Sequence, residues 1–336
     1  MNRIQVLPGF EVAGYRRHEL HADDRVWVEK NCYVDVCIEL LHALGLEPLA
    51  LLGACAAIDF EGDNFTFFKP SHDEMRLFFG LDVQELNVWR PLIEHAAEHL
   101  AAGKLISTET DSFNLPDTEG TDYQRNHVKT TIILADLDVE ARRLGYFHNA
   151  GYYTLDGQDF ARLFRLDQAP DPAFLPLFAE VIRVDRLVRR TPGALKRLAR
   201  ELLAIHVARR PASNPLVAFQ HRFERDLPEI QGQGLGYYHA WAFATVRQVG
   251  AASELLSLHL RWLGSPEAGE SLASAADDFE RLSAAAKTFI LKAARAVNTR
   301  RAVDASAIFL EMAQAWERGM SRLALAVGSE MSEQPV

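Results

Sequence analysis

A run of helix-breaking residues near the middle of the chain, Gln168-Ala-Pro-Asp-Pro172, separates two stretches with different hydrophobic patterns. Before it, helical periodicity alternates with short β-branched runs and polar turns, which predicts an α+β domain over residues 1–168. After it, the apolar spacing is helical nearly throughout, which predicts an α-helical bundle domain over residues 169–330. A chain of 336 residues is long enough to form two such domains, each with its own core.

Local signals place the individual elements. Asn31 is a good N-cap and Gly45 a good C-cap, so a helix is expected over 32–44. Further helices are predicted over 82–102 (as one or two helices) and 157–166, and strands over 64–70, 104–109, 127–134, 144–148 and 152–155. In the second domain, helices are predicted over 173–189, 192–209, 213–226, 235–263, 275–298 and 303–327.

The charge is unevenly shared between the two halves. Residues 1–170 carry 15 Lys and Arg against 28 Asp and Glu, whereas the rest of the chain carries 21 against 18. The formal net charge of −10 argues against nucleic acid as a partner. The most apolar run, residues 40–58, is interrupted by polar residues, glycine and proline, so no membrane span is expected.

Three cysteines, Cys32, Cys37 and Cys55, are too few for a disulfide framework, and no Cys/His cluster has the spacing of a metal site. The N-terminus lacks the apolar core of a signal peptide, so a reduced, cytoplasmic protein is the simplest interpretation. No glycine-rich phosphate loop occurs, which argues against a nucleotide cofactor.

Cys32 is the cysteine best placed to act as a nucleophile, because it lies in the first turn of the predicted helix directly after its N-cap. The helix dipole and the free backbone N–H groups there favour a thiolate, which is the nucleophilic form of cysteine. The alternative is a small core residue, and that interpretation suits Cys37 and Cys55 better than any role in catalysis.

A base for such a nucleophile would come from elsewhere in the chain. His127 begins a β-branched strand directly after a polar loop, and the next strand ends at His148 and Asn149. A Cys…His…Asn order with the cysteine on a helix is the arrangement of cysteine proteases with an α+β fold. With 12 histidines in the chain, however, spacing alone leaves other pairs possible.

The segment from Asp111 to Phe160, beginning DSFNLPDTEGTDYQRNHVKTTIIL, resembles papain-like acyltransferases of the butirosin-biosynthesis type. In those enzymes an acidic residue and a Leu-Pro pair precede a loop and then a histidine at the start of an apolar strand. The whole chain is also similar to a bacterial family known as domain of unknown function 1839, which is associated with carrier-protein-dependent amino acid metabolism. The resemblance implies a papain-like fold for residues 1–168 and a helical domain after it.

The same resemblance implies the roles of individual residues. Cys32 would be the nucleophile, His127 the base and Asn149 the residue that orients His127, with Asp136, Asp138 and His148 as competitors for that last role. No glutamine lies just upstream of Cys32 to complete an oxyanion hole, so Asn31 or a backbone N–H would serve.

The implied reaction is acyl transfer in two steps. The Cys32 thiolate would take an acyl or aminoacyl group from a carrier-protein thioester and pass it to a small-molecule amine. The phosphopantetheine arm of the carrier protein is the only cofactor-like group required. Two alternatives remain open: a hydrolase of the same fold (amidase, peptidase or thioesterase), and a non-catalytic module that binds the carrier protein.

Two further sets of residues would serve such a site. Asp111, Trp27, Tyr152 and Tyr153 are candidates for the walls of an acyl pocket, although each aromatic ring could equally be ordinary core. Residues 183–210 hold nine Arg and Lys against two acids, which suits docking of an acidic carrier protein. The docking candidates are Arg189, Arg190, Lys196 and Arg197, and the alternative for them is a solvated helix face.

Overall fold

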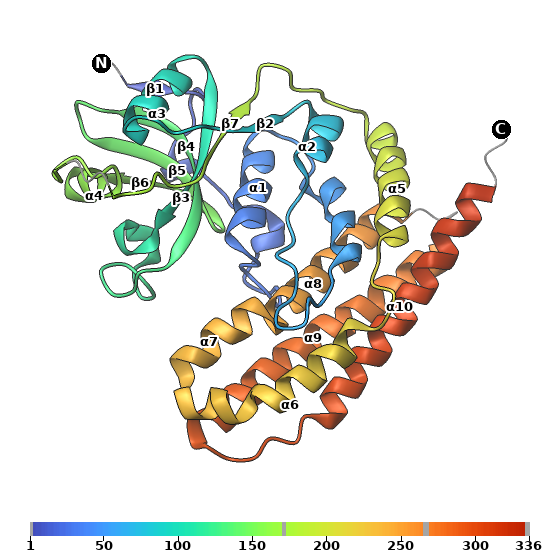
Figure 1. The fold of residues 1–336 in the computed structure, drawn as a ribbon. Helices are drawn as coiled ribbons and strands as arrows, with labels where there is room; N and C mark the ends of the chain where they lie inside the picture. The colour runs from blue at the N-terminus through green and yellow to red at the C-terminus, as the bar shows by residue number, and fades with distance from the viewer. Residues whose placement is uncertain (1–2, 170–172, 265–268, 333–336) are drawn as a thin grey trace. The chain divides into compact units, whose positions relative to one another are not determined.

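The computed structural model describes residues 3–169, 173–264 and 269–332 (Figure 1). Contacts between Cα atoms divide the chain into two compact units whose segments alternate along the sequence. We call them the sheet unit (1–23, 31–48 and 71–190) and the helical unit (24–30, 49–70 and 191–336). Neither unit is one continuous stretch of chain, and each is described here by itself.

Within the described ranges, the sheet unit is built on one antiparallel sheet of seven strands in the order β2-β7-β3-β4-β5-β6, with β1 paired to β4. The strands are β1 (Ile4–Gln5), β2 (Asp82–Glu85), β3 (Lys104–Asp111), β4 (Lys129–Asp138), β5 (Arg143–His148), β6 (Gly151–Asp156) and β7 (Ala179–Arg183). The helices are α1 (Cys32–Ala43), α2 (His72–Phe79), α3 (Leu92–Ala101) and α4 (Gly157–Leu163), with short 3-10 turns between them.

The two faces of this sheet are covered by different helices. Ile132, Leu134 and Tyr146 lie in one core cluster with residues of α3 and α4, so these helices cover that face. Successive side chains of a strand point to opposite faces, and Thr131 and Ile133 therefore point to the other face. Helix α1 packs there, against β4, β5 and β6. The sheet thus has an α1 face and an α3/α4 face.

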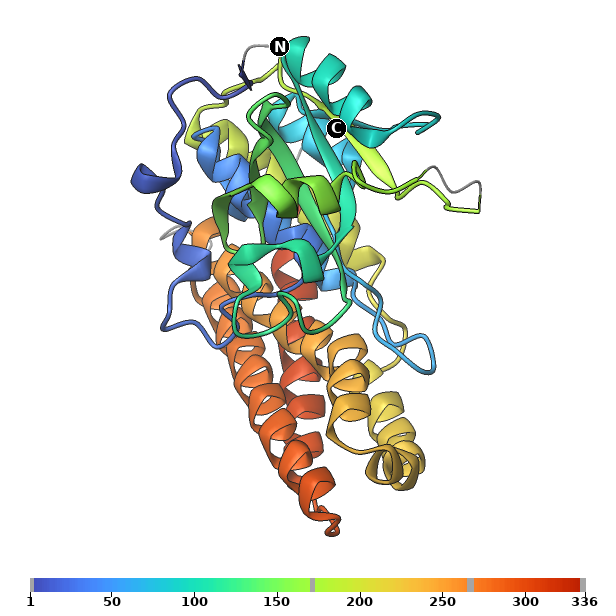
Figure 2. The same ribbon diagram turned by 90° about the vertical axis from the view of Figure 1, so that its left-hand side faces the viewer.

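Helices α5 to α10 make up most of the helical unit. They are α5 (Pro192–Ala208), α6 (Pro215–Gln233), α7 (Leu235–Ala244), α8 (Val246–Leu263), α9 (Gly269–Thr299) and α10 (Ser306–Ser332). The long helices α9 and α10, orange and red in Figure 2, run side by side. Four buried rings, Phe219, Phe223, Phe289 and Phe309, pack against one another in this bundle in edge-to-face and tilted pairs.

Two segments from the first third of the chain complete the helical unit. The Trp27 indole donates to Ser283 Oγ at 2.9 Å, and the backbone amides of Val26 and Trp27 donate to Glu254 at 2.9 and 3.2 Å. Phe65 is buried against Phe219, and its amide donates to the Ala244 carbonyl. The apolar run at residues 48–57 forms a 3-10 helix rather than a continuous α-helix.

These elements confirm the coarse prediction: a mixed region with an antiparallel sheet is followed by a helical region. Four local predictions are wrong. The single helix predicted over 235–263 is divided at Thr245 into α7 and α8. Residues 82–85 and 179–183 form strands instead of helices, because β7 pairs with both β2 and β3 and this pairing outweighs local helical spacing. Residues 64–70 make a single bridge between Phe60 and Phe65 instead of a strand. Among the described residues, no helix has the length and apolar character needed to cross a membrane.

Candidate functional site

Helix α1 begins at Cys32 on the sheet's α1 face. The Asn31 side chain accepts a hydrogen bond from the Val34 amide at 2.9 Å, which fixes the first turn as an N-cap. Cys32 is half-buried there, whereas Cys37 and Cys55 are buried and inaccessible.

A single polar contact connects the Cys32 sulfur to the sheet. Its Sγ lies 3.6 Å from Thr131 Oγ1 of β4. Within the part of the chain that the structure describes, the sulfur has no hydrogen bond to a histidine. The hydroxyl of Thr131 therefore occupies the place directly against the thiol where a general base would lie in a preformed catalytic pair.

His127 lies just before β4 and is paired with Asp111 at the end of β3. Nδ1 of the imidazole is 2.6 Å from Asp111 Oδ2, and the ring stacks on Phe113 at 4.4 Å between centroids. An ionised carboxylate can only accept, so Nδ1 carries the proton and Nε2 is left available for proton transfer. The imidazole is 73% exposed and the carboxylate 37%, which makes this pair accessible to a substrate.

Strand register places the thiol and this pair on the same face of the sheet. Asp111 is the direct cross-strand partner of Lys129, and Lys129 shares its face with Thr131. His127 precedes Thr131 by four residues, about 13 Å of extended chain at about 3.3 Å per residue. Cys32 and the His127–Asp111 pair are therefore neighbours along one face and are not in contact.

Asn149 lies in the tight turn between β5 and β6, with a left-handed φ of 43°. Its amide has no hydrogen-bond partner among the described residues, and it does not contact His127. The residue that holds the His127 ring is instead Asp111, which the sequence analysis placed in the pocket wall. Asp111 stands 16 positions earlier on a different strand, so only the β3–β4 register identifies it.

His148 forms a second, buried imidazole–carboxylate pair, on the α3/α4 face. Its Nδ1 is 2.5 Å from Asp117, and Thr130 lies 2.8 Å from its Nε2. The Tyr146 hydroxyl donates to the same carboxylate, and burial next to that charge raises the pKa of Tyr146. His148 therefore does not orient His127, and no motif in the sequence pointed to Asp117 as its partner.

The other two carboxylates considered for the orienting role have different partners. Asp136 is buried between the guanidinium groups of Arg3 and Arg143, and these ion pairs connect β4 to β5 and to the residue directly before β1. Asp138 accepts a hydrogen bond from the Ala141 amide at 2.9 Å in the β4–β5 turn. Both serve the hairpin and neither contacts His127.

The three aromatic rings expected to line one pocket lie in three different places. Trp27 is buried in the helical unit. Tyr152 packs against Phe147, its partner across the strands. Tyr153 is the partner of Tyr146 on the α3/α4 face. Tyr152 and Tyr153 are thus separated by the sheet itself, because adjacent residues of a strand point to opposite faces.

The four basic side chains expected to dock a carrier protein have different surroundings. Arg189 donates to the carbonyls of Leu44 and Gly45 at the end of α1, at 2.9 and 3.1 Å. Arg190 donates in the same way to Leu77 and Phe78 at the end of α2, at 2.8 and 3.1 Å. These arginines satisfy carbonyls that a helix end leaves unpaired. Lys196 lies over the Trp262 ring at 5.3 Å, and Arg197 is exposed.

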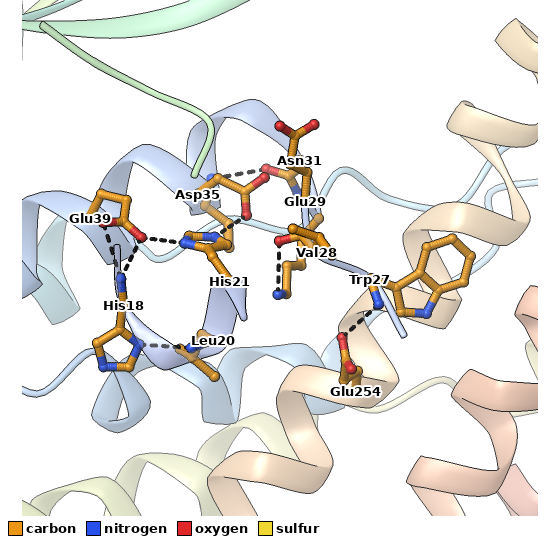
Figure 3. A network of polar contacts seen from close by, with 12 residues as sticks. His18, Leu20, His21, Trp27, Val28, Glu29, Asn31, Asp35, Glu39 and Glu254 are labelled. Carbon is orange, nitrogen blue, oxygen red and sulfur yellow. Dashed lines mark hydrogen bonds and ion pairs between the residues drawn. The ribbon is translucent and has the colours of Figure 1, made fainter. Parts of the chain in front are cut away.

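Sequence reasoning missed a buried network beneath α1, shown in Figure 3. His21 is completely buried between Asp35, at 2.9 Å from its Nε2, and Glu39, which contacts its Nδ1. Burial alone would raise the pKa of Glu39, but the hydrogen bond and charge of His21, with the Tyr15 hydroxyl and the His18 amide, lower it. This network anchors α1 to the N-terminal segment one turn beyond Cys32.

A second cluster holds the other side of the same helix. The Tyr33 hydroxyl donates to the buried Glu180 of β7 at 3.0 Å, and His72 lies 2.9 Å from the other carboxylate oxygen. Burial and the nearby Glu180 raise the pKa of Tyr33, which keeps it protonated. No group of three or more His, Cys, Asp and Glu side chains arranged to hold a metal ion occurs among the described residues.

Comparison with known proteins identifies the family. No curated protein matches this chain. Residues 16–184 match the model of the DUF1839 N-terminal domain, and residues 193–325 match the model of the DUF1839 C-terminal domain. Together these matches cover most of the 336 residues, and the chain therefore belongs to the DUF1839 family.

Proposed function

We propose that this protein is a papain-like cysteine acyltransferase, which takes an acyl or aminoacyl group from a carrier-protein thioester and passes it to a small-molecule amine. One observation carries the proposal: a half-buried cysteine at the N-terminus of α1 shares a sheet face with the exposed His127–Asp111 pair. A helix that presents a cysteine from its first turn to an antiparallel sheet is the arrangement expected of a papain-like fold.

Each group has a defined part in the proposed reaction. His127, moved within reach, takes the proton of the Cys32 thiol at Nε2. The resulting thiolate attacks the thioester carbonyl, and the first-turn N–H groups of α1 stabilise the oxyanion. The carbon–sulfur bond to the carrier breaks, and His127 protonates the departing thiolate at Nε2. An amine then attacks the acyl-enzyme and gives its proton to His127, after which the Cys32 thiolate departs again.

The distance between the thiol and the imidazole is part of the proposal. Proton transfer requires the His127 ring within hydrogen-bond reach of the reacting atoms, so the segment 112–128 must move toward Thr131 when substrate binds. Asp111 would travel less, because it ends a paired strand. In this scheme Asp111 is a positioning residue that fixes the imidazole tautomer, the role first considered for Asn149.

A non-catalytic module that binds the carrier protein is the second candidate, favoured by the Cys32–Thr131 contact. A hydroxyl against the sulfur leaves the thiol without a base until His127 moves. Under both candidates the partner is an acidic carrier protein. Of the four basic residues predicted to dock it, Arg197 is exposed and stays available for this role. The three free cysteines suit a reducing compartment such as the cytoplasm.

Intact-mass spectrometry after incubation with an aminoacyl-loaded carrier protein tests the proposal. We expect an acyl adduct on Cys32 that Cys32→Ser removes, with Cys37→Ala on the same helix as the matched control. His127→Ala should slow adduct formation by about 10²–10⁴-fold. Carrier binding without any adduct would overturn the acyltransferase and leave the binding module, and an adduct that persists in Cys32→Ser would overturn Cys32 as the nucleophile.

A further inference from the structure

A pocket of about 480 Å³ opens within the sheet unit, between the loop before α3 and the chain after α4. Its lining includes Trp89 and Leu92 from the first segment and Leu163, Phe174 and Leu177 from the second. The volume lies in the range of small-molecule sites, about 300–1,000 Å³. Leu163 belongs to the core cluster of the α3/α4 face, so the pocket is separate from the Cys32 face.

Large apolar side chains around this pocket are left in contact with water. Trp89 is 76% exposed, and Phe174 and Leu177 are about 40% exposed. A contiguous apolar surface of this kind costs free energy in water unless something covers it, and such surfaces mark binding sites. The apolar lining therefore fits the hydrocarbon part of a ligand.

Two arginines, Arg90 and Arg165, line this pocket. The Arg165 guanidinium lies over the Phe174 ring at 3.9 Å and makes no hydrogen bond or ion pair with any residue in the described ranges. Arg165 also has a left-handed φ of 58°, an uncommon conformation for a non-glycine residue. Arg90 pairs with Glu94 and Glu98 through its terminal nitrogens, but its Nε is buried without a partner among the described residues.

We propose that this pocket binds an amphiphile that has an aliphatic chain and a single anionic head group. The chain would lie along Leu163, Leu177 and the Trp89 ring, where it covers the exposed apolar surface. The head group would pair with Arg165, which has no counter-charge among the described residues, and with Arg90, whose Nε has no hydrogen-bond partner there. A carboxylate or a phosphate monoester satisfies this chemistry equally, because both accept from guanidinium N–H groups.

Titration calorimetry with decanoate, decyl phosphate and decanol, below micelle-forming concentrations, tests this site on the full-length chain. We expect saturable binding of at least one anion, at least about 10-fold tighter than that of decanol, since a charged hydrogen bond is worth about that factor. The tighter of the two anions then identifies the head group.

Two variants that each remove one positive charge, in α4 and just after it, locate the site. Arg165→Gln should weaken anion binding by about 10-fold or more. Arg162→Gln, an equal change of charge three residues earlier on α4 and outside the pocket lining, should leave anion binding within about 2-fold, because an exposed charge outside the site is screened. Equal binding of decanol and the anions, equal effects of the two variants, or no saturable heat would each overturn the proposal.

Discussion

Two imidazole–carboxylate pairs stand on the same sheet and differ chiefly in burial. The His127–Asp111 pair on the α1 face is exposed, at 73% and 37% for the two side chains. The His148–Asp117 pair on the α3/α4 face is buried, at 1% and 4%. The exposed ring has a stacking partner and one carboxylate, whereas the buried ring is fixed at both nitrogens.

This contrast separates stability from chemistry. A buried pair with Thr130 and Tyr146 as additional partners leaves no nitrogen for a substrate, and its loss would strand a charge in the core. An exposed pair contributes little to stability because water screens it, but its free Nε2 can exchange a proton. The residue types are the same, and the environment assigns the role.

The sharpest way to break this comparison is to remove the buried ring. Asp117 has two side-chain partners here, His148 and Tyr146, and His148→Ala removes the first of them. Because the buried carboxylate then lacks its imidazole partner, the variant should lower the free energy of unfolding by about 3 kcal/mol or more. Urea unfolding followed by circular dichroism measures the loss. If His148→Ala lowered the free energy of unfolding by less than His127→Ala does, burial would not determine how much these pairs contribute to stability.

A third imidazole sharpens the comparison, because it is buried and no carboxylate pairs with it among the described residues. His259 of the helical unit has Nδ1 2.7 Å from the Leu49 carbonyl, and burial lowers its pKa from 6.5 to about 4. The folded state then binds fewer protons than the unfolded state between these values. The stability that neutral His259 provides is complete above pH 6.5 and is lost as the pH falls toward 4.

The loss should reach roughly 3 kcal/mol at pH 4, since each pKa unit corresponds to about 1.4 kcal/mol. Urea unfolding at pH 7 and at pH 4 measures it in the wild type. His259→Gln, which cannot titrate, is the control and should lose correspondingly less over the same interval. Parallel pH profiles for the two proteins would show that His259 is not the group responsible.

The smallest expected effect belongs to the exposed pair. His127→Ala and Asp111→Asn should each change the free energy of unfolding by less than about 1 kcal/mol, because solvent screens the pair. Thermal unfolding of both variants, measured beside His148→Ala, provides the test. If His127→Ala lowered the free energy of unfolding as much as His148→Ala does, His127 would be a structural residue, and the argument for its chemical role would fail.

Local signals account for what the sequence could predict. Helix α1 begins and ends at its capping residues, and the strands β3 to β6 follow β-branched runs joined by short turns. Strands β2 and β7 were missed because each is short and acquires its conformation from pairing with distant strands. The position of Cys32 on α1 follows from Asn31 in the same way.

The partners of the site residues could not be predicted from spacing. Asp111 meets His127, and Asp117 meets His148, through sheet register and a loop fold that no short motif encodes. The same holds for Arg189 and Arg190, whose charge suggested an interaction surface. Both reach helix ends that lie more than 100 residues away in sequence.

The alternation of segments between the two units has a consequence for any attempt to study them apart. Trp27 and Phe65, which precede most of the sheet in the sequence, are core residues of the helical unit. A gene divided between residues 184 and 193 would yield a C-terminal polypeptide deprived of both rings. Co-expression of the two pieces, with the N-terminal one supplying these rings in trans, is therefore the arrangement in which a split protein would regain its native state.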